Sequence, residues 1–391
     1  MASERIVCAG GRIFNGVELL EDHCAIFVNG VCTDVVVVSA ASSAERVIEL
    51  DNDVLSVGYT DLQVNGGGGV MLNDGPSLQN LVTIAEAHRK LGTVCLLPTL
   101  ISDTFDTTVA AINAVEQAID KNVTGIAGLH LEGPHLSVAK KGAHAEQYIR
   151  PMDSADLNVL LEAARDLPCL MVTVAPENVT TQQVNALAEA GVIVALGHTD
   201  ASYDTCVDYH KAGARCVTHL FNAMSQLGSR EPGLTGAAID CDALSVGLIA
   251  DGIHVHPASI RAAWNGKSVS DRFYLVTDAM APAGTDHQSF TLNDRTIYRR
   301  DGRLTLANGT LAGADLDLTG AIRLMHYGAG IDLESVLRSV TTVPRSVLSQ
   351  GTNPNTRAES GSTSLIGTPI EDMIRISSDL LSVAPLESVI R

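Results

Sequence analysis

From residue 57 onward, short apolar runs of strand length alternate with longer segments in which apolar residues recur at helical spacing. The apolar runs lie at 57–65, 93–100, 125–133, 169–177, 192–199, 215–222, 244–252 and 273–280. Helical patterns occupy most of the intervals, for example 78–91, 155–166 and 181–190. Because strands joined by connections of this length form parallel sheets, this series of eight predicts a (β/α)8 barrel of the TIM type.

The two ends of the chain have a different pattern. Residues 1–56 contain strand-like runs at 5–8, 25–28, 33–39 and 46–50, with Asn29-Gly30 as a hairpin turn. After the barrel we expect a hairpin region at 289–305, helices near 316–327 and 333–348, a loop at 349–364, and strands at 372–377 and 386–390. The expected organisation is therefore a barrel at 57–348 and a small β-sandwich domain built from 1–56 and 349–391.

Most of the apolar runs end in ionisable or amide side chains. These are Gln63, Asn65, His130, Glu132, His198, His219, Asp251, His254 and Asp278. The carboxyl ends of barrel strands converge on one face, where this fold builds its active sites. One polar residue at a strand end is ordinary turn chemistry, but this repetition indicates a functional site.

Three of these residues are typical ligands of a catalytic metal ion. Glu132, His198 and His219 offer one carboxylate and two imidazoles, and leave a coordination position for water. Such an ion lowers the pKa of water and polarises a carbonyl group, while Asp278 would be free to act as general base and acid. A lone histidine at a strand end is more often structural, so the ligand role depends on the whole set. His130 shares the inward face with Glu132, and we expect it to support the ligands.

Charge and cysteine content narrow the class of protein. The formal net charge is −19, which argues against nucleic-acid or anionic-membrane partners. The eight cysteines lack C-x-x-C spacing, so neither a disulfide framework nor a cysteine-rich zinc site is expected. The first residues contain no long apolar segment, and no apolar run approaches membrane-spanning length. We therefore expect a cytoplasmic enzyme.

Several ordered stretches make the sequence similar to a known family. They include His130-Leu131-Glu132-Gly133-Pro134, and the stretches at 58–66, 140–144, 197–199, 219–224, 251–254, 277–279 and 311–313. In this set and order the chain resembles the N-acetylglucosamine-6-phosphate deacetylase family of the amidohydrolase superfamily. The resemblance implies hydrolysis of N-acetyl-D-glucosamine 6-phosphate to D-glucosamine 6-phosphate and acetate, in amino-sugar catabolism. It also implies a barrel with a small β domain built from both termini.

The resemblance assigns roles by position. It implies metal binding by Glu132, His198 and His219, acid–base catalysis by Asp278, and contact of His144 with the acetamide carbonyl. The implied sugar-phosphate contacts are Ala143, His144, Asn222, Ala223, Asp251, Gly252, Ile253, His254, Leu311, Ala312 and Gly313. Arg230 matches an arginine that reaches the phosphate of the substrate in a neighbouring subunit, so a homodimer is expected. The alternative for Arg230 is an ordinary surface pair with Glu231.

The number of metal ions is also predicted. Many amidohydrolases carry His-x-His at the end of the first barrel strand, whereas this chain has Gln63 and Asn65. Neutral amides are poor ligands for zinc or iron, so we expect one divalent ion per subunit, zinc or ferrous iron. Two departures from the family pattern are His135, where relatives commonly carry Phe or Tyr, and a divergent C-terminal segment around 371–374.

Three other functions remain open. Deacetylation of N-acetylgalactosamine 6-phosphate differs by the orientation of one hydroxyl, and no motif separates the two sugars. A cyclic-amide or nucleobase amidohydrolase is disfavoured by the stretches 140–144 and 222–224, which match sugar-phosphate contacts. An inactive scaffold is disfavoured because every expected ligand and Asp278 are retained.

Overall fold

The computed structural model describes residues 4–40, 46–293, 295–351 and 364–390. Its largest element is an eight-stranded sheet of β8 (Tyr59–Val64), β11 (Thr93–Ile101), β12 (Leu129–Glu132), β13 (Leu170–Val174), β14 (Ile193–Leu196), β15 (Cys216–Val217), β16 (Ser245–Leu248) and β17 (Phe273–Leu275). Each strand pairs in parallel with the next one along the chain. A bridge between Val64 and Ala279, and a 3.0 Å hydrogen bond from Asp278 N to Gln63 O, close the ring. The predicted (β/α)8 barrel is confirmed.

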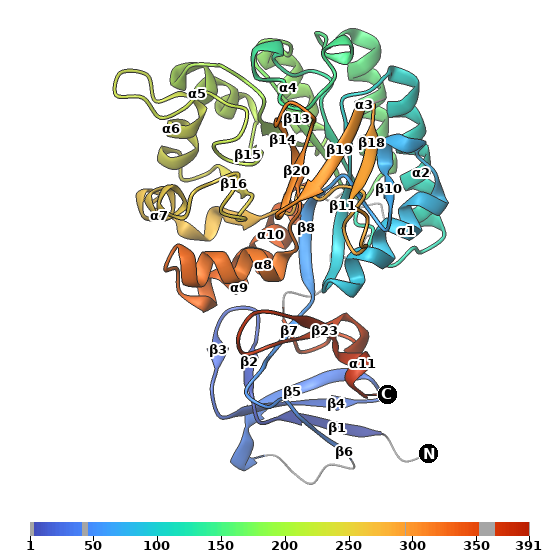
Figure 1. Ribbon diagram of the computed structural model, residues 1–391, viewed down its shortest axis with the longest axis vertical. Helices are drawn as coiled ribbons and strands as arrows, with labels where there is room; N and C mark the ends of the chain where they lie inside the picture. Colours follow the sequence, from blue (N-terminus) through green and yellow to red (C-terminus); the bar gives the residue numbers. More distant parts are fainter. Residues whose placement is uncertain (1–3, 41–45, 294, 352–363, 391) are drawn as a thin grey trace.

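Helices surround the barrel (Figure 1). They are α1 (Leu78–Lys90), α2 (Phe105–Asp120), α3 (Ser154–Asp166), α4 (Thr181–Glu189), α5 (Tyr203–Ala212), α6 (Gly233–Asp240), α7 (Pro257–Gly266), α8 (Leu318–Arg323), α9 (Leu333–Val340) and α10 (Thr342–Gln350). Local sequence starts several of them, because side chains of Ser77, Thr104, Asp153, Thr180 and Ser202 accept hydrogen bonds from free backbone N–H groups of the first turn.

Several strands are shorter than their apolar runs. The run 215–222 forms only β15, because His219, Phe221 and Ala223 have φ values of 31°, 75° and 49° and turn the chain away from the sheet. The run 125–133 begins its strand only at Leu129, after Gly125 at φ 92° and Gly128 at φ 155°. Residues at the carboxyl end of an apolar run that do not join the sheet, such as 218–222, form the loops of the functional face.

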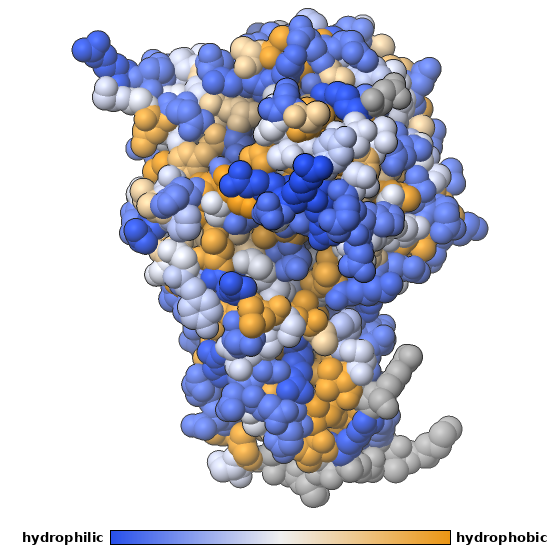
Figure 2. All heavy atoms as spheres, in the orientation of Figure 1, coloured by the Kyte–Doolittle hydropathy of each residue, from blue (hydrophilic) through white to orange (hydrophobic). Residues whose placement is uncertain are grey.

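A second, antiparallel sheet is inserted after β17. It contains β18 (Ser289–Leu292), β19 (Arg295–Arg300), β20 (Arg303–Thr305) and β21 (Leu311–Ala314), which confirms the expected hairpin region. Ala314 N donates to Asp278 O over 3.1 Å, so this sheet is attached to the functional face of the barrel. Figure 2 shows strongly hydrophilic side chains where Figure 1 draws β19 and β20, the strands that carry Arg295, Arg299, Arg300 and Arg303.

Two sheets form the small domain below the barrel (Figure 1). One contains β1 (Arg5–Ala9), β4 (His23–Val28), β5 (Val31–Val37) and β6 (Arg46–Glu49). The other contains β2 (Arg12–Phe14), β3 (Leu19–Leu20), β7 (Val54–Val57), β22 (Met373–Ile376) and β23 (Val383–Pro385). Phe27 of the first sheet and Leu55 and Met373 of the second share one buried cluster. The C-terminal β22 pairs antiparallel with β7, so both ends of the chain build this domain, as expected.

One C-terminal prediction is wrong. Residues 386–390, expected as a strand, form the helix α11 (Leu386–Ile390). Pro385 ends the strand because it has no N–H to continue the ladder, and Glu387 in the first turn interacts favourably with the positive end of the helix dipole. The predicted loop 349–364 falls mostly outside the described residues. Among the residues that are described, no helix is both long and apolar enough to cross a membrane.

Candidate metal centre and substrate cavity

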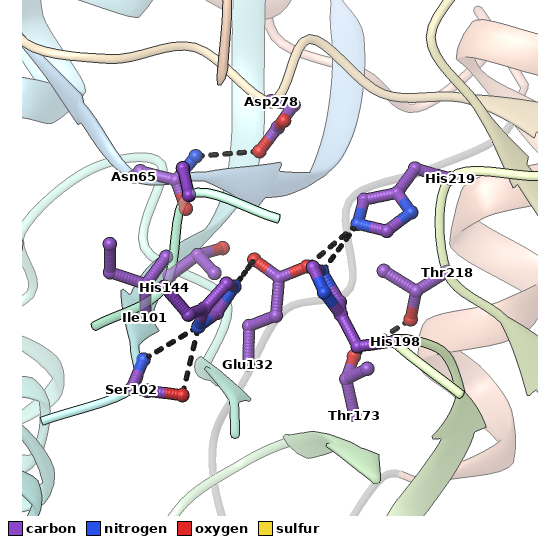
Figure 3. Close-up of polar contacts among 12 residues, drawn as sticks. Asn65, Ile101, Ser102, Glu132, His144, Thr173, His198, Thr218, His219 and Asp278 are labelled. Carbon is purple, nitrogen blue, oxygen red and sulfur yellow. Dashed lines mark hydrogen bonds and ion pairs between the residues drawn. The ribbon is translucent and has the colours of Figure 1, made fainter. Parts of the chain in front are cut away.

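Three barrel strands bring one carboxylate and two imidazoles to a single point. Glu132 is the last residue of β12, while His198 and His219 each lie two residues beyond β14 and β15. Glu132 Oε1 is 3.2 Å from His198 Nε2 and 2.9 Å from His219 Nε2, and the two Nε2 atoms are 3.0 Å apart (Figure 3). All three side chains are buried. Within the described ranges, this is the one group of His, Cys, Asp and Glu residues whose atoms could hold a metal ion together.

The backbone at this face is unusual. His198, His219 and Asp278 have φ values of 47°, 31° and 50°, in the left-handed region that residues with a side chain rarely adopt. Each such residue costs on the order of 1–3 kcal/mol, which the surrounding packed structure must offset. These three positions turn the chain where each strand ends, so that the side chains point across the mouth of the barrel.

The hydrogen bonds of His198 show that the group fits a cation. His198 Nδ1 lies 2.8 Å from Lys140 O, so this nitrogen carries the proton and donates it to the carbonyl. With its proton on Nδ1, an uncharged His198 ring has a lone pair at Nε2, and Nε2 faces the carboxylate of Glu132 at 3.2 Å. Two electron-rich atoms at this distance repel each other unless a positive charge lies between them. The residues therefore fit a divalent metal ion, with the Lys140 carbonyl fixing the imidazole orientation.

Two amides of the first barrel strand hold Asp278 beside this centre. Asn65 Nδ2 donates to Asp278 Oδ1 over 2.7 Å (Figure 3). Gln63 Nε2 donates to the same oxygen over 3.2 Å and to Glu132 Oε1 over 3.1 Å. Burial, together with the negative charge of Glu132, raises the pKa of Asp278 to about 6. A carboxyl group with this pKa can both take and return a proton near neutral pH.

His144 faces the centre from the opposite side of the cavity. Its Nδ1 lies 3.3 Å from the backbone N–H of Ser102 and 2.8 Å from Ser102 Oγ. Since the backbone N–H can only donate, Nδ1 is the acceptor and the proton of the neutral ring is on Nε2, which lies 3.8 Å from Glu132 Oε2 (Figure 3). Burial and the neighbouring His198 lower the pKa of His144 to about 3. His144 is therefore a neutral hydrogen-bond donor toward the cavity.

His130 does not reach the metal group. Its ring lies between Leu62 O, at 3.0 Å from Nδ1, and Thr173 Oγ1, at 2.8 Å from Nε2. Burial lowers the pKa of His130 to about 4, so the ring is neutral. Its position below the ligands agrees with the supporting role expected for it.

A cavity of about 420 Å³ opens over these groups. Of the residues predicted from the sequence, its lining contains Ala143, His144, Asn222, Ala223, His254, Leu311 and Gly313, together with Glu132, His198, His219 and Asp278. Asp251 does not line the cavity but holds the turn that carries His254. Its carboxylate accepts hydrogen bonds from Ile253 N, His254 N and His254 Nδ1 over 2.8, 2.7 and 2.6 Å. Gly252 and Ile253 form this turn and do not line the cavity, and Ala312 is buried in the core of the antiparallel sheet.

Arg230 lies outside the cavity. It is exposed in the loop before α6, which projects from the barrel at the upper left of Figure 1. Its expected alternative partner, Glu231, instead accepts hydrogen bonds from Tyr203 N and Gly233 N over 2.7 and 3.0 Å. None of the described residues that line the cavity is a lysine or arginine. Two residues of the site, Ser102 and Thr310, were not predicted from the sequence; Ser102 lies two residues beyond the apolar run 93–100, and this position could have indicated it.

A (β/α)8 barrel with this group of ligands at its carboxyl face defines a metal-dependent hydrolase of the amidohydrolase type. The sequence is 40% identical over 342 residues, 87% of this chain and 86% of the relative, to an N-acetylgalactosamine-6-phosphate deacetylase of Shewanella sp. (strain ANA-3). It is 34% identical over 336 residues, 85% of this chain and 87% of the relative, to an N-acetylglucosamine-6-phosphate deacetylase of Haemophilus influenzae. A crystal structure of N-acetylglucosamine-6-phosphate deacetylase from Pasteurella multocida matches with a TM-score of 0.87 and 31% identity over 97% of each chain. No protein-family model matches the sequence. The chain belongs to the N-acetylglucosamine-6-phosphate deacetylase family, as its motifs predicted.

Proposed function

We propose that this enzyme removes the acetyl group from an N-acetylated hexosamine 6-phosphate, with N-acetyl-D-glucosamine 6-phosphate as substrate and D-glucosamine 6-phosphate and acetate as products. The observation that carries the proposal is the arrangement within one cavity. A metal-ligand group lies at its floor, His144 presents a neutral donor from one side, and Asp278 presents a carboxylate with a raised pKa from the other.

Glu132, His198 and His219 would hold one divalent ion, zinc or ferrous iron. When bound, this ion supplies Lewis acidity, which lowers the pKa of a water molecule and polarises the acetamide carbonyl. The amide nitrogens of Gln63 and Asn65 donate to the carboxylates of Glu132 and Asp278, and neutral amides are weak ligands for such an ion.

The side chains around the ion divide the proton transfers between them. Asp278 takes a proton from the attacking water, and Asn65 holds the carboxylate in place by its 2.7 Å hydrogen bond. His144 donates from Nε2 to the carbonyl oxygen, where negative charge develops in the transition state. Asp278 then returns its proton to the substrate nitrogen, so that the C–N bond breaks and glucosamine 6-phosphate leaves as a neutral amine.

A second substrate has a specific observation in its favour. The relative at 40% identity is named for N-acetylgalactosamine 6-phosphate, whereas the Haemophilus relative at 34% identity is named for N-acetylglucosamine 6-phosphate. The two sugars differ only at the C4 hydroxyl. Steady-state kinetics with both sugar phosphates, and with both sugars lacking phosphate, decide the substrate. A kcat/KM at least tenfold higher for N-acetylgalactosamine 6-phosphate would replace the first proposal by the second, and no acetate from any of the four would overturn both.

The composition of the cavity lining supports a dimer. A phosphate dianion is best bound by a lysine or arginine, but the described lining residues include neither, while Arg230 forms no ion pair among the described residues and its neighbour Glu231 accepts from Tyr203 N. Arg230 would therefore serve the cavity of a second subunit, where its planar guanidinium can contact phosphate through two hydrogen bonds.

The free thiols of all eight cysteines support a cytoplasmic location.

A further inference from the structure

Arg295, the first residue of β19, makes an unusual contact with the segment that carries His144. Its Nη2 donates to Ala143 O over 2.6 Å, while its Nε is enclosed by protein without a hydrogen-bond partner. Arg295 forms no ion pair with any carboxylate in the described part of the chain, unlike Arg299 on the same strand, which pairs with Asp315 over 2.8 Å. Within the described residues, the Ala143 carbonyl is the one hydrogen-bond partner of its guanidinium group.

The segment 140–144 connects the metal group to the substrate-facing side of the cavity. At one end Lys140 O accepts from His198 Nδ1. At the other end His144 enters the cavity beside Ala143, which also packs on the apolar core of the antiparallel sheet. Between them Gly142 has φ 56°, and a Cβ at this position would lie 3.4 Å from His198 Cε1. Arg295 holds the carbonyl immediately before His144, so it fixes the peptide plane from which the imidazole projects.

We propose that Arg295 is a positioning residue for deacetylation: by holding the Ala143 carbonyl against the antiparallel sheet, it fixes the direction in which His144 presents Nε2 to the acetamide oxygen. This inference rests on the proposed function. Arg295 does not line the cavity, so it acts through the segment and not on the substrate.

The consequence should be concentrated in turnover. A donor aimed at developing charge loses much of its effect when displaced, and a shift of about 1 Å can cost about a hundredfold in rate. Of the implied sugar-phosphate contacts in the cavity lining, only Ala143 and His144 belong to this segment, while Asn222, Ala223 and His254 lie outside it. Replacing Arg295 should therefore lower kcat by a larger factor than it raises KM.

Three variants test this in the metal-loaded enzyme. Arg295→Met removes the hydrogen bond and the charge at similar length. Arg295→Lys keeps the charge and one donor. Arg300→Met is the matched control, because Arg300 is exposed at the far end of the same strand, with its guanidinium 5.0 Å from the ring centre of Tyr298. We expect kcat to fall about ten- to a hundredfold in Arg295→Met, to recover in part in Arg295→Lys, and to stay unchanged in Arg300→Met.

Hydrogen exchange tests the role of Arg295 independently of whether the enzyme deacetylates the proposed substrate. In the substrate-free, metal-loaded enzyme, backbone amides of 140–145 should exchange faster in Arg295→Met than in Arg300→Met, at equal metal content and equal melting temperature. If the wild type releases no acetate, the proposed function fails, while the exchange rates still decide whether Arg295 holds the segment. Equal exchange and equal kcat in the two methionine variants would show that Arg295 has no positioning role. No recovery with lysine, together with a lowered melting temperature, would make it a folding residue only.

Discussion

Replacing Asp278 by asparagine is the sharpest test of the proposed chemistry, because the change is nearly isosteric. Among the described residues, only Asn65 Nδ2 and Gln63 Nε2 donate to the carboxylate, and both donate to Oδ1. An asparagine with its carbonyl oxygen at the Oδ1 position keeps both hydrogen bonds. The variant therefore retains the geometry of the site and loses the ability to take and return a proton.

The size of the effect follows from that single loss. A positioned general acid–base group contributes about 10²- to 10⁴-fold in rate, which corresponds to about 2.7–5.4 kcal/mol of transition-state stabilisation at 1.36 kcal/mol per decade. We expect Asp278→Asn to lower kcat by this factor in an acetate-release assay. Metal content by elemental analysis should match the wild type, because Asp278 is outside the ligand group.

The pH dependence gives the same test a second readout. The reaction needs the unprotonated carboxylate, so wild-type kcat/KM should fall as the pH drops through the pKa of Asp278; burial and Glu132 raise this pKa, and a bound cation lowers it. Asparagine does not titrate, so this acid limb should be absent from the residual activity of the variant. Near-normal turnover of a metal-loaded Asp278→Asn enzyme, or an unchanged acid limb, would falsify the assignment.

Three further outcomes are expected. Titration of the apo-enzyme with zinc should restore full activity at about one equivalent, since the described residues contain one ligand group; activity that appears only with the second equivalent would contradict this. Ser102→Ala should lower kcat about tenfold with little change in KM or metal content, because His144 Nδ1 loses its 2.8 Å hydroxyl partner; unchanged kinetics would show that the backbone N–H suffices. Mixed dimers of Asp278→Asn and Arg230→Ala subunits should regain part of the activity that each homodimer lacks; mixed dimers without such a gain would remove the shared-site model.

Strand order and the position of the metal group could be predicted from the sequence, because both depend on local periodicity and on residue type. Glu132, His198 and His219 each end an apolar run, and parallel strands bring such ends to one face. The helix at α11 could not be predicted in this way, since its five residues are too few to show a period, and Pro385 acts on the strand before it.

The position of the proton on a histidine ring also could not be predicted from the sequence. Nothing in the sequence near His144 shows that its Nδ1 faces the backbone N–H of Ser102, which lies 42 residues earlier in the chain. The contact of Arg295 with Ala143 spans 152 residues and joins an inserted sheet to a barrel loop. Such pairs carry no periodic signal, because they depend on how two loops meet and not on the pattern within either one.

The amides at the end of β8 explain how two carboxylates can share one small cavity with different roles. Glu132 is buried and Asp278 is partly buried, and two bare carboxylates in a medium of low polarity repel each other and favour protonation of one. Gln63 donates to both from a single nitrogen, and Asn65 adds a shorter hydrogen bond to Asp278 alone. Histidines at these positions would offer lone pairs to a second ion. The proposed single ion and the proposed role of Asp278 as a base beside it therefore both depend on these two amide donors.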